Sequence, residues 1–490
     1  MEYYVCIDFG GTNTKVILYT AQGRLYKNCS FKTDAINLGS GRREIDLIDL
    51  KNKIMDALSS LVASIDEAGK ITGIICIGHG KGLYVLDDNR EIFTNGILSI
   101  DERGIDIAAA LEQDSKSIWS ISYQHIMPSQ APVLLKWLKD NDRSVYDRIG
   151  YVLSAKDFIR FLLTGEIQQE IGDASGNNLI NLNKKRYDQK LLEYFDILEM
   201  ESCLPPLVSF KDICGEITSQ VSRITGIPEG TPVIGGFFDI DACTLGAGVI
   251  DERYLNVVAG TWNINVLVSN TPSINHPGIM NSIYLDNKYL IEASSPTSAG
   301  NLDTFLQIIE NKKIDYERIN VMVSDAKSKS NVLFYPFLYG TQKVSKGSGA
   351  FIGLKKGNTL GQMYRSVYEG VAFAHKYHIE ELRKVCKDLP QKLRISGGIV
   401  NSEVWLQIFA DVLQMEIEVI DEIELGCLGG VIALNAVFDK DQIEPEYIEK
   451  FIKVKKTIMP STNQQYYQNK YKVYLKGIEL LEPLWALCDQ

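Results

Sequence analysis

The sequence predicts an α/β fold built from two related halves, and two observations support this prediction. Strand-like and helix-like segments alternate along the 490 residues, which is typical of the α/β class. In addition, "YVCIDFGGTNTKVILY" near residue 4 and "LNVVAGTWNINVLVS" near residue 255 share one plan of apolar strand, Gly-Thr turn and second apolar strand. This internal repeat predicts two lobes with a cleft between them, divided near residue 248 into domains of residues 1–248 and 249–490.

The individual elements follow from the hydrophobic pattern. Strands are expected at "YYVCIDFG", "KVILYT" and "GIICIG" in the first half, and at "YLNVVAG", "INVLVS", "LFYPFLYG" and "LRISGG" in the second. Helices are expected from Leu47 to Ser64, from Pro132 to Lys139 and in the C-terminal "YYQNKYKVYLKGIELL". In "SEVWLQIFADVLQ" the apolar residues fall on one helical face, and Ser402 is placed to cap the helix.

The composition restricts the partners and the compartment. The net charge is -11, so no general positive field exists to attract nucleic acid or an anionic membrane. The nine cysteines include no CxxC pair, which indicates reduced thiols in the cytoplasm. No signal pattern is expected, and no run approaches the ~20 apolar residues of a membrane helix. A homodimer is the expected assembly, because dimers are the commonest symmetric oligomers.

The first Gly-Thr turn has the composition of a phosphate-binding hairpin. Its glycines allow the backbone N–H groups to approach an anion, and a lysine supplies a point charge. The carboxylate before the turn would repel a phosphate unless a magnesium ion lay between them. The alternative is a plain hairpin turn with an exposed aspartate. The residues concerned are Asp8, Gly10, Gly11, Thr12, Asn13 and Lys15, and the turn that matches them in the second half contains Gly260 and Thr261.

The stretch "TPVIGGFFDIDACTLGAG" predicts a catalytic carboxylate. An apolar strand ends in two glycines and two phenylalanines, and Asp239 follows them. A carboxylate beside aromatic rings is partly desolvated, so its pKa rises toward a value suited to accepting a proton. The alternative is that Asp239 or Asp241 only caps the following helix, and spacing alone does not choose between the two.

A third group of polar residues follows other strand ends. "IGHGKGLYVLDDNREIFTNGILSIDER" contains His79, Gly80 and Lys81 in a glycine-rich loop, and then Asp101 and Arg103. Polar groups of both signs in such a place could bind sugar hydroxyls. The alternatives are a satisfied backbone contact for His79 and a surface ion pair for Asp101 with Arg103.

The stretch "LRISGGIVNSEVW" ends a strand with Gly397 and Gly398, just before the helix that Ser402 caps. Glycines at this place allow a flat group such as a nucleotide base to lie on the backbone. The alternative is an ordinary turn between a strand and a helix.

Together these motifs resemble the FGGY family of carbohydrate kinases over essentially the whole chain. "DFGGTNTK" and "AGTW" resemble the first and second phosphate motifs of the family. "GGFFDIDACTLGAG" resembles the segment with the catalytic base, and counting back from its small residues makes Asp239 the matching aspartate. "GGIVNSEVWLQIFADV" and "ELGCLGG" resemble the adenosine-binding part, and "GAFIGLKKGNTLGQMYRSVYE" fits the C-terminal signature.

The resemblance implies an actin/hexokinase/Hsp70-like ATPase fold with a ribonuclease H-like motif in each lobe. It also implies a phosphotransferase with an alcohol acceptor, which uses ATP and Mg²⁺. Asp239 would be the base and, with Asp8, a metal ligand, while both turns would hold the phosphates. Gly397, Gly398 and Ser402 would bind the nucleotide, and Gly80, Lys81, Asp101 and Arg103, with Asp239, would bind the sugar.

Within the family, "GHGKGLYVLDDNREIFTNGILSIDER", "GDASGNNL" and "EASSPTSAGNLDTF" are most similar to L-xylulose kinases. This implies that L-xylulose is converted to L-xylulose 5-phosphate. Gly80-Lys81 replaces the Met-His pair of common D-xylulose kinases, and Val133 stands where the N-terminal signature has lysine. The alternative acceptors are D-xylulose, 3-keto-L-gulonate, L-ribulose and gluconate. A non-enzymatic nucleotide switch of the same fold is a remote alternative.

Overall fold

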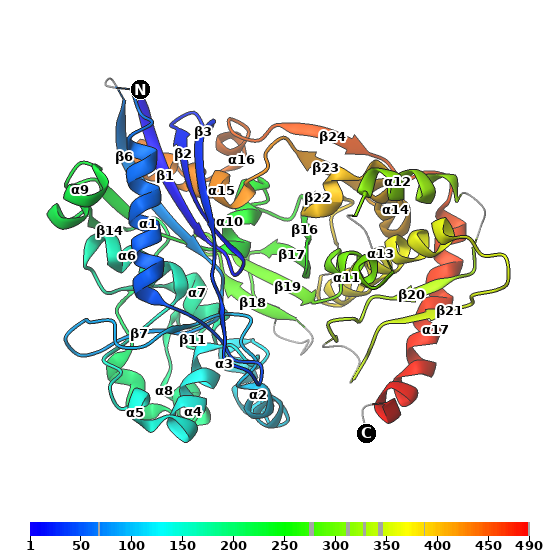
Figure 1. The fold of residues 1–490 in the computed structure, drawn as a ribbon, viewed down its shortest axis with the longest axis horizontal. Helices are drawn as coiled ribbons and strands as arrows, with labels where there is room; N and C mark the ends of the chain where they lie inside the picture. Colours follow the sequence, from blue (N-terminus) through cyan, green and yellow to red (C-terminus); the bar gives the residue numbers. More distant parts are fainter. Residues whose placement is uncertain are drawn as a thin grey trace. The chain divides into compact units, whose positions relative to one another are not determined.

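The computed structural model describes residues 1–66, 69–273, 279–309, 314–326, 330–341, 346–386 and 388–488. These residues form two compact units of mixed α and β structure (Figure 1). Unit 1 comprises Met1–Ile250, Ser269–Leu290 and Glu422–Ile452. Unit 2 comprises Asp251–Val268, Ile291–Asp421 and the residues from Lys453 onward. The predicted boundary at residue 248 is close to the end of the first segment of unit 1, and two later segments also belong to that unit.

Unit 1 is built on a six-stranded sheet with the order β14-β15-β6-β1-β2-β3. β1 pairs in parallel with β6 and antiparallel with β2, so the first Gly-Thr turn joins two central strands. The strands are β1 (Glu2–Phe9), β2 (Asn13–Thr20), β3 (Leu25–Lys32), β6 (Lys70–Gly78), β14 (Ile213–Glu216) and β15 (Pro232–Phe238).

Alternate residues of β1 point to opposite faces of this sheet, and each face is covered. Val5, Ile7 and Phe9 belong to the buried core that includes the apolar faces of α1 (Leu47–Val62) and α6 (Ala155–Thr164). Cys6 lies on the other face, where Gly430 of α15 (Leu425–Asp439) comes so close that an added Cβ would be 3.4 Å from its sulfur. Asp8 shares the face of Cys6, because side chains alternate along a strand.

α10 (Asp239–Gly246) packs closely against α15 within unit 1. A Cβ on Gly246 would lie 1.8 Å from the carbonyl oxygen of Leu425, and one on Gly429 would lie 2.0 Å from that of Ala242. Only glycine allows such an approach of the two backbones. The small residues after Asp239 therefore fix the position of the helix on which this carboxylate stands.

The remaining elements of unit 1 are short. Its helices are α2 (Ile105–Glu112), α3 (Lys116–Ser122), α4 (Ala131–Asn141), α5 (Arg143–Tyr146), α7 (Ile171–Gly176), α8 (Gln189–Tyr194), α9 (Ser219–Thr225), α16 (Pro445–Ile448) and the 3₁₀ helix η1 (Leu198–Cys203). Its short strands are β4 (Ile36–Asn37), β5 (Arg43–Ile45), β7 (Tyr84–Leu86), β8 (Gly96–Ile97), β9 (Tyr151–Leu153), β10 (Gln169–Glu170), β11 (Ile180–Asn181), β12 (Arg186–Tyr187), β13 (Leu207–Val208) and β18 (Met280–Ile283).

Unit 2 repeats the central plan of unit 1. Its strands follow the order β19-β17-β16-β22-β23-β24, in which β16 pairs antiparallel with β17 and in parallel with β22. β22 also pairs in parallel with β23, as β6 does with β15 in unit 1. The predicted duplication is therefore confirmed at the level of strand order and direction. The strands are β16 (Leu255–Ala259), β17 (Asn263–Ser269), β19 (Tyr289–Ser295), β22 (Lys392–Ser396), β23 (Glu416–Ile420) and β24 (Val454–Ile458).

The other elements of unit 2 include the longest helices of the described chain. They are α11 (Gly300–Ile309), α12 (Tyr316–Asp325), α13 (Leu360–Val385), α14 (Glu403–Leu413), α17 (Gln464–Cys488), the 3₁₀ helix η2 (Gly398–Asn401), β20 (Leu333–Tyr335) and β21 (Ala350–Ile352). Ser402 caps α14 as predicted, because its hydroxyl accepts a bond from the Trp405 N–H. The strand predicted for "LFYPFLYG" is wrong beyond Tyr335, because Pro336 has no N–H for a ladder and the chain then turns.

Candidate active site

The first Gly-Thr turn joins β1 and β2, and three of its carbonyl groups already have partners. The Gly10 N–H donates to the Asn13 carbonyl at 3.1 Å. The Thr33 hydroxyl donates to the Gly10 carbonyl at 2.8 Å, and the Thr33 N–H donates to the Thr12 carbonyl at 2.9 Å. Within the described residues, the N–H groups of Gly11 and Thr12 have no protein acceptor. The turn is thus held by its acceptors and leaves donors for an anion.

Asp8 and Lys15 lie opposite each other in the antiparallel ladder, so their side chains share one face of the sheet. The Lys15 ammonium is 3.9 Å from the Asp8 carboxylate and 2.5 Å from that of Glu424, which precedes α15. Burial raises the pKa of Asp8 to about 6, although the charge of Lys15 opposes the rise. Burial lowers the pKa of Lys15, but both carboxylates outweigh this effect and raise it. No local pattern connects Glu424 with Lys15, so its role could not be predicted from the sequence.

Asp239 is the first residue of α10, directly after β15. Gly236 has a φ of 80° and packs so closely on β6 that a Cβ would be 2.0 Å from the Cys76 carbonyl oxygen. A shift of register between Ile234 and Phe237 accompanies this bulge. The glycine pair therefore re-aims the end of the strand and, with it, the first residue of the helix.

The surroundings of Asp239 bring its pKa close to neutrality, where both the protonated and the ionised form are populated. Burial raises its pKa to about 7, with a further contribution from the charge of Asp8, and the charge of Lys81 opposes the rise. The Asp239 carboxylate accepts a bond from the Ile240 N–H at 2.8 Å. Because Phe238 is the N-cap residue, neither Asp239 nor Asp241 stands at the N-cap position. A half-buried carboxylate with this pKa is suited to accept a proton from an alcohol.

The loop after β6 packs against the residue that precedes Asp239. A Cβ on Gly80 would lie 2.5 Å from the Phe238 ring. The loop can therefore pack this closely on Phe238 only with glycine at position 80. Lys81 has a φ of 68°, and it has no ion-pair partner among the described residues. His79 is buried, its Nε2 lies 2.8 Å from the Tyr84 hydroxyl, and burial lowers its pKa to about 4. His79 is thus held inside the protein by a hydrogen bond to a side chain, whereas Lys81 presents an unpaired charge near Asp239.

Asp101 and Arg103 form a buried pair and not a surface pair. The side chain of Asp101 is fully buried and binds the Arg103 guanidinium at 2.9 Å and the Arg43 N–H at 2.6 Å. Arg103 also binds Glu44 at 2.6 Å and lies 4.9 Å from the centre of the Trp137 ring. These contacts hold the loop in place, and the predicted contact of Asp101 and Arg103 with the sugar stays a prediction.

A buried ionic cluster, which is not among the features predicted from the sequence, acts electrostatically on Asp239. Lys156 lies within 3.6 Å of the carboxylates of Asp157, Glu170 and Asp173, and Arg160 binds Asp157 at 2.6 Å. The charge of Asp173 contributes to the raised pKa of Asp239. The sequence feature that could have indicated this cluster is "AKDFIR", in which charged residues interrupt an otherwise apolar helix face.

Asp241 belongs to the same region, and its pKa is raised well above the usual value by burial and by the charge of Glu170. It is 1% exposed, and its Oδ1 has no hydrogen-bond partner among the described residues. A neutral, enclosed carboxylic acid differs in chemistry from the neighbouring Asp239, which is half-buried. The structure thus distinguishes Asp239 from Asp241 by exposure and pKa, which the spacing of the two residues in the sequence does not do.

In unit 2 the second Gly-Thr turn is enclosed by two glycines from distant segments. The Gly300 N–H donates to the Gly260 carbonyl at 3.2 Å, and a Cβ on Gly300 would lie 3.1 Å from the Thr261 Cα. Gly397 has a φ of 96°, and its Cβ would lie 2.3 Å from the Ala259 carbonyl oxygen. The structure therefore brings Gly260, Thr261 and Gly397 together, and it adds Gly300.

The other two predicted nucleotide residues lie farther along the same segment. An added Cβ on Gly398 would meet no heavy atom within 4 Å, so its backbone is open on that side. The Ser402 hydroxyl donates to the Asn320 amide oxygen at 2.6 Å besides capping α14. Ser402 is therefore engaged in protein contacts, and Gly398 is accessible.

The donor chemistry in unit 1 is consistent with magnesium. Among the described residues, no group of three or more His, Cys, Asp or Glu side chains forms a metal cage. Asp8 and Asp239 are two carboxylates whose pKa values are both raised by burial. Mg²⁺ is usually held by one or two carboxylates together with substrate phosphates and water. The residues therefore fit this ion better than a metal that requires a complete protein cage.

No helix in the described ranges is long and apolar enough to cross a membrane. The nine cysteines are all free.

Comparison with known proteins shows the class to which this fold and site belong. Residues 3–246 match the N-terminal domain of the FGGY family of carbohydrate kinases, and residues 255–437 match its C-terminal domain. The chain belongs to the FGGY family of carbohydrate kinases, which are phosphotransferases with an alcohol group as acceptor.

The chain is 32% identical to the L-xylulose/3-keto-L-gulonate kinase of Escherichia coli strain K12, over 99% of this chain and 98% of that protein. It is also 32% identical to a probable L-xylulose kinase of Haemophilus influenzae, over 99% of this chain and all of that protein. The crystal structure of a ligand-bound xylulose kinase from Lactobacillus acidophilus superposes with a TM-score of 0.92 at 22% identity, covering 98% of both chains. The predicted fold and family are confirmed.

Proposed function

We propose that the protein transfers the γ-phosphoryl group of ATP to the 5-hydroxyl of L-xylulose and forms L-xylulose 5-phosphate. The observation that carries the proposal is the position of Asp239, at the first residue of α10 and within electrostatic reach of Asp8 and Lys81. The names of the two relatives at 32% identity support L-xylulose as the acceptor.

In this proposal Asp239 orients the acceptor hydroxyl and takes its proton as the bond to phosphorus forms. The backbone N–H groups of Gly11 and Thr12, with Lys15, hold the phosphates in unit 1. Such groups act by positioning and by neutralising charge, which supply most of the rate in phosphoryl transfer. Asp8 and Asp239 would hold Mg²⁺, which would neutralise phosphate charge when bound.

The other assignments complete the proposal. Residues 1–248 supply the sugar site, the first phosphate motif and the base, and residues 249–490 supply the second phosphate motif and the adenosine site. Gly10 and Asn13 support the first turn, and Gly260 and Thr261 form the second. The sugar is bound by Gly80, Lys81, Asp101 and Arg103. The nucleotide is bound by Gly397, Gly398 and Ser402. The enzyme acts in the cytoplasm, and a homodimer is its proposed assembly.

The unpaired ammonium of Lys81 favours a second candidate acceptor, 3-keto-L-gulonate, because a sugar acid brings a carboxylate that a cation can bind. The name of the Escherichia coli relative also includes this acid. A third candidate function is a nucleotide switch without a sugar substrate. It leaves Asp239 without a function as a base.

One assay distinguishes the candidate acceptors from one another and from a nucleotide switch. The purified protein is incubated with ATP and Mg²⁺, and ADP release is measured with L-xylulose, D-xylulose, L-ribulose, 3-keto-L-gulonate and gluconate. We expect the highest kcat/KM with L-xylulose. A higher value with the sugar acid would transfer the proposal to that substrate, and release independent of every acceptor would contradict sugar phosphorylation.

A further inference from the structure

A buried hydrogen-bond network lies next to the second Gly-Thr turn in unit 2. We call it the serine–histidine network. It connects β17, the end of β19 with the segment that follows, and helix α13, and every member is at most 2% exposed. Its members are Asn263, Asn265, Ser295, Thr297, Ser298, His375 and His378.

The bonds around His375 have only one consistent direction. Both N–H groups of the Asn265 amide are used, because it donates to Asn263 Oδ1 at 2.7 Å and to the Ala293 carbonyl at 3.1 Å. Asn265 Oδ1 lies 3.0 Å from His375 Nδ1 and can only accept, so Nδ1 carries the proton. Burial lowers the pKa of His375 well below its usual value, so the ring is neutral. Its Nε2 therefore accepts a bond from the Ser298 hydroxyl at 2.8 Å.

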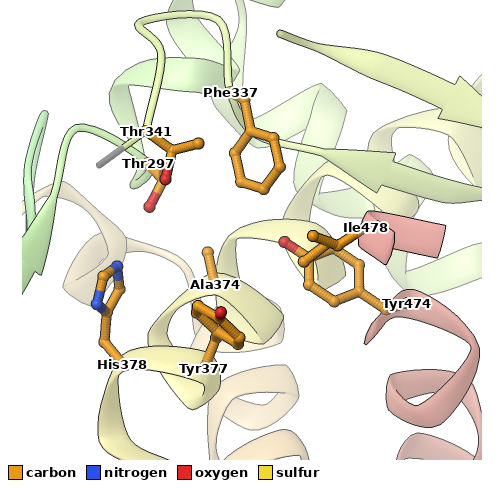
Figure 2. A pocket seen from close by; sticks show the side chains of 8 residues that line it. All are labelled: Thr297, Phe337, Thr341, Ala374, Tyr377, His378, Tyr474 and Ile478. Carbon is orange, nitrogen blue, oxygen red and sulfur yellow. The ribbon is translucent and has the colours of Figure 1, made fainter. Parts of the chain in front are cut away.

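A second arm of the network starts from Asn263. The Asn263 amide donates to Thr297 Oγ1 at 3.3 Å, and Thr297 Oγ1 lies 2.6 Å from Ser295 Oγ. Ser295 Oγ lies 2.6 Å from His378 Nε2. Figure 2 shows Thr297 and His378 lining one small cavity, together with Phe337. The cavity measures only about 10 Å³, so little free volume lies beside this second arm.

The network reaches the Gly-Thr turn by two separate routes. Asn263 pairs with Ala259 across the turn, so its side chain anchors the strand that leaves it. Ser298 lies two residues before Gly300, whose N–H donates to the Gly260 carbonyl. Both sides of the turn are thus tied to α13 through His375.

We propose that His375 and Ser298 are positioning residues for nucleotide binding, which hold the Gly260-Thr261 turn in the shape that receives the phosphates of ATP. This inference rests on the proposed function, in which that turn binds phosphate. A turn that binds an anion through its backbone gains most when its donors are fixed in advance, because no ordering is then needed on binding. The competing explanation is that the network only satisfies buried polar groups, which would affect stability alone.

Direct binding measurements distinguish the two explanations without the need for enzymatic activity. The affinities of the full chain for adenylyl imidodiphosphate with Mg²⁺ and for adenosine are measured by titration calorimetry. We expect Ser298→Ala to weaken the triphosphate analogue about 10-fold, the equivalent of one lost hydrogen bond in the supporting network, and to leave adenosine unchanged. His375→Gln is a second variant with the same expected result.

Ser366→Ala is the matched control. Ser366 lies on α13, is 2% exposed, and donates its hydroxyl to the Met363 carbonyl within the same helix. This variant also removes one buried hydroxyl, but outside the network, so we expect wild-type affinity for both ligands. Circular dichroism establishes the temperature at which all three variants are folded.

Each result decides something. Unchanged binding of the analogue by folded Ser298→Ala and His375→Gln would overturn the inference, as would an equal loss for adenosine. If the wild-type protein binds the analogue but phosphorylates no sugar, the acceptor assignment fails while the positioning inference is still decided by the binding data. If the wild-type protein does not bind the analogue, both fail.

Discussion

The ammonium group of Lys15 lies 2.5 Å from the carboxylate of Glu424, a residue 409 positions later in the sequence. This contact brings the second strand of unit 1 to the start of α15. Glu424 is 14% exposed, so an unpaired charge there would be poorly solvated. The pair therefore stabilises unit 1, besides placing the lysine beside Asp8.

We expect the effects of substitutions in this pair on the melting temperature to be non-additive. Lys15→Met leaves two carboxylates without their cation and should lower the Tm by about 1–3 °C. Adding Glu424→Gln to that variant should recover most of the loss, because it removes one stranded charge. A double variant that melts below both single variants would show that the pair does not couple the two segments.

The role of Asp239 as the base predicts a change in kcat with little change in nucleotide binding. Asp239→Asn should lower kcat by a factor of about 10²–10⁴, the usual contribution of a general base. Asp241→Asn is the matched control, because an amide resembles the neutral acid that burial imposes on Asp241. We expect the control to retain at least a third of wild-type kcat. The assignment would have to be abandoned if the two variants were equally active.

The pKa of Asp239 also predicts how stability varies with pH. A folded pKa of about 7 above the ordinary 3.8 means that the folded protein retains a proton that the unfolded chain loses in this window. The unfolded state then binds fewer protons, so stability falls as pH rises from about 4 to about 7. Asp239→Asn should therefore melt a few degrees above the wild type at pH 8, and this difference should shrink at pH 4. Scanning calorimetry without nucleotide or magnesium measures both values, and a constant difference would contradict the assigned shift.

Because Lys81 has an unpaired charge near Asp239, we expect its substitution to change KM for the sugar acceptor and not KM for ATP. Lys81→Met removes the cation while keeping an unbranched side chain. We expect KM for the sugar to rise by about 10-fold, the value of one charged hydrogen bond, and KM for ATP to stay within twofold. Steady-state kinetics with each substrate varied in turn test this split. Equal changes in both KM values would mean that Lys81 acts on the site as a whole.

The strands and turns of the fold could be predicted because their signals are local. The apolar runs, the two Gly-Thr turns and the Ser402 cap each lie within a few residues, and the structure has both turns, the cap and strands at most of the runs. The prediction for "LFYPFLYG" was wrong because apolar composition outweighed Pro336, which cannot donate to a ladder.

Parts of the site could not be predicted, because they depend on contacts between residues far apart in the sequence. The contact of Lys15 with Glu424 and that of Ser298 with His375 join residues far apart in the sequence, and a single sequence carries no signal for such pairs. Lys156 illustrates a further difficulty. A lysine in an apolar helix is usually expected to be exposed, yet Lys156 is fully buried. Its charge is compensated by the carboxylate of Asp157, which follows it in α6, and by those of Glu170 and Asp173 from another segment.

The packing of α10 on α15 predicts that Gly246 is essential for stability. A Cβ on Gly246 would be 1.8 Å from the Leu425 carbonyl oxygen, a backbone atom that cannot move without displacing α15. Gly246→Ala should therefore cost about 1–3 kcal/mol or more, the usual effect of overpacking, and lower the Tm accordingly. Gly176→Ala is the matched control, because a Cβ there would meet no heavy atom within 4 Å. Because α10 begins at Asp239, folded Gly246→Ala should also lose kcat, and wild-type stability and kcat in this variant would show that the two helices are not held by this contact.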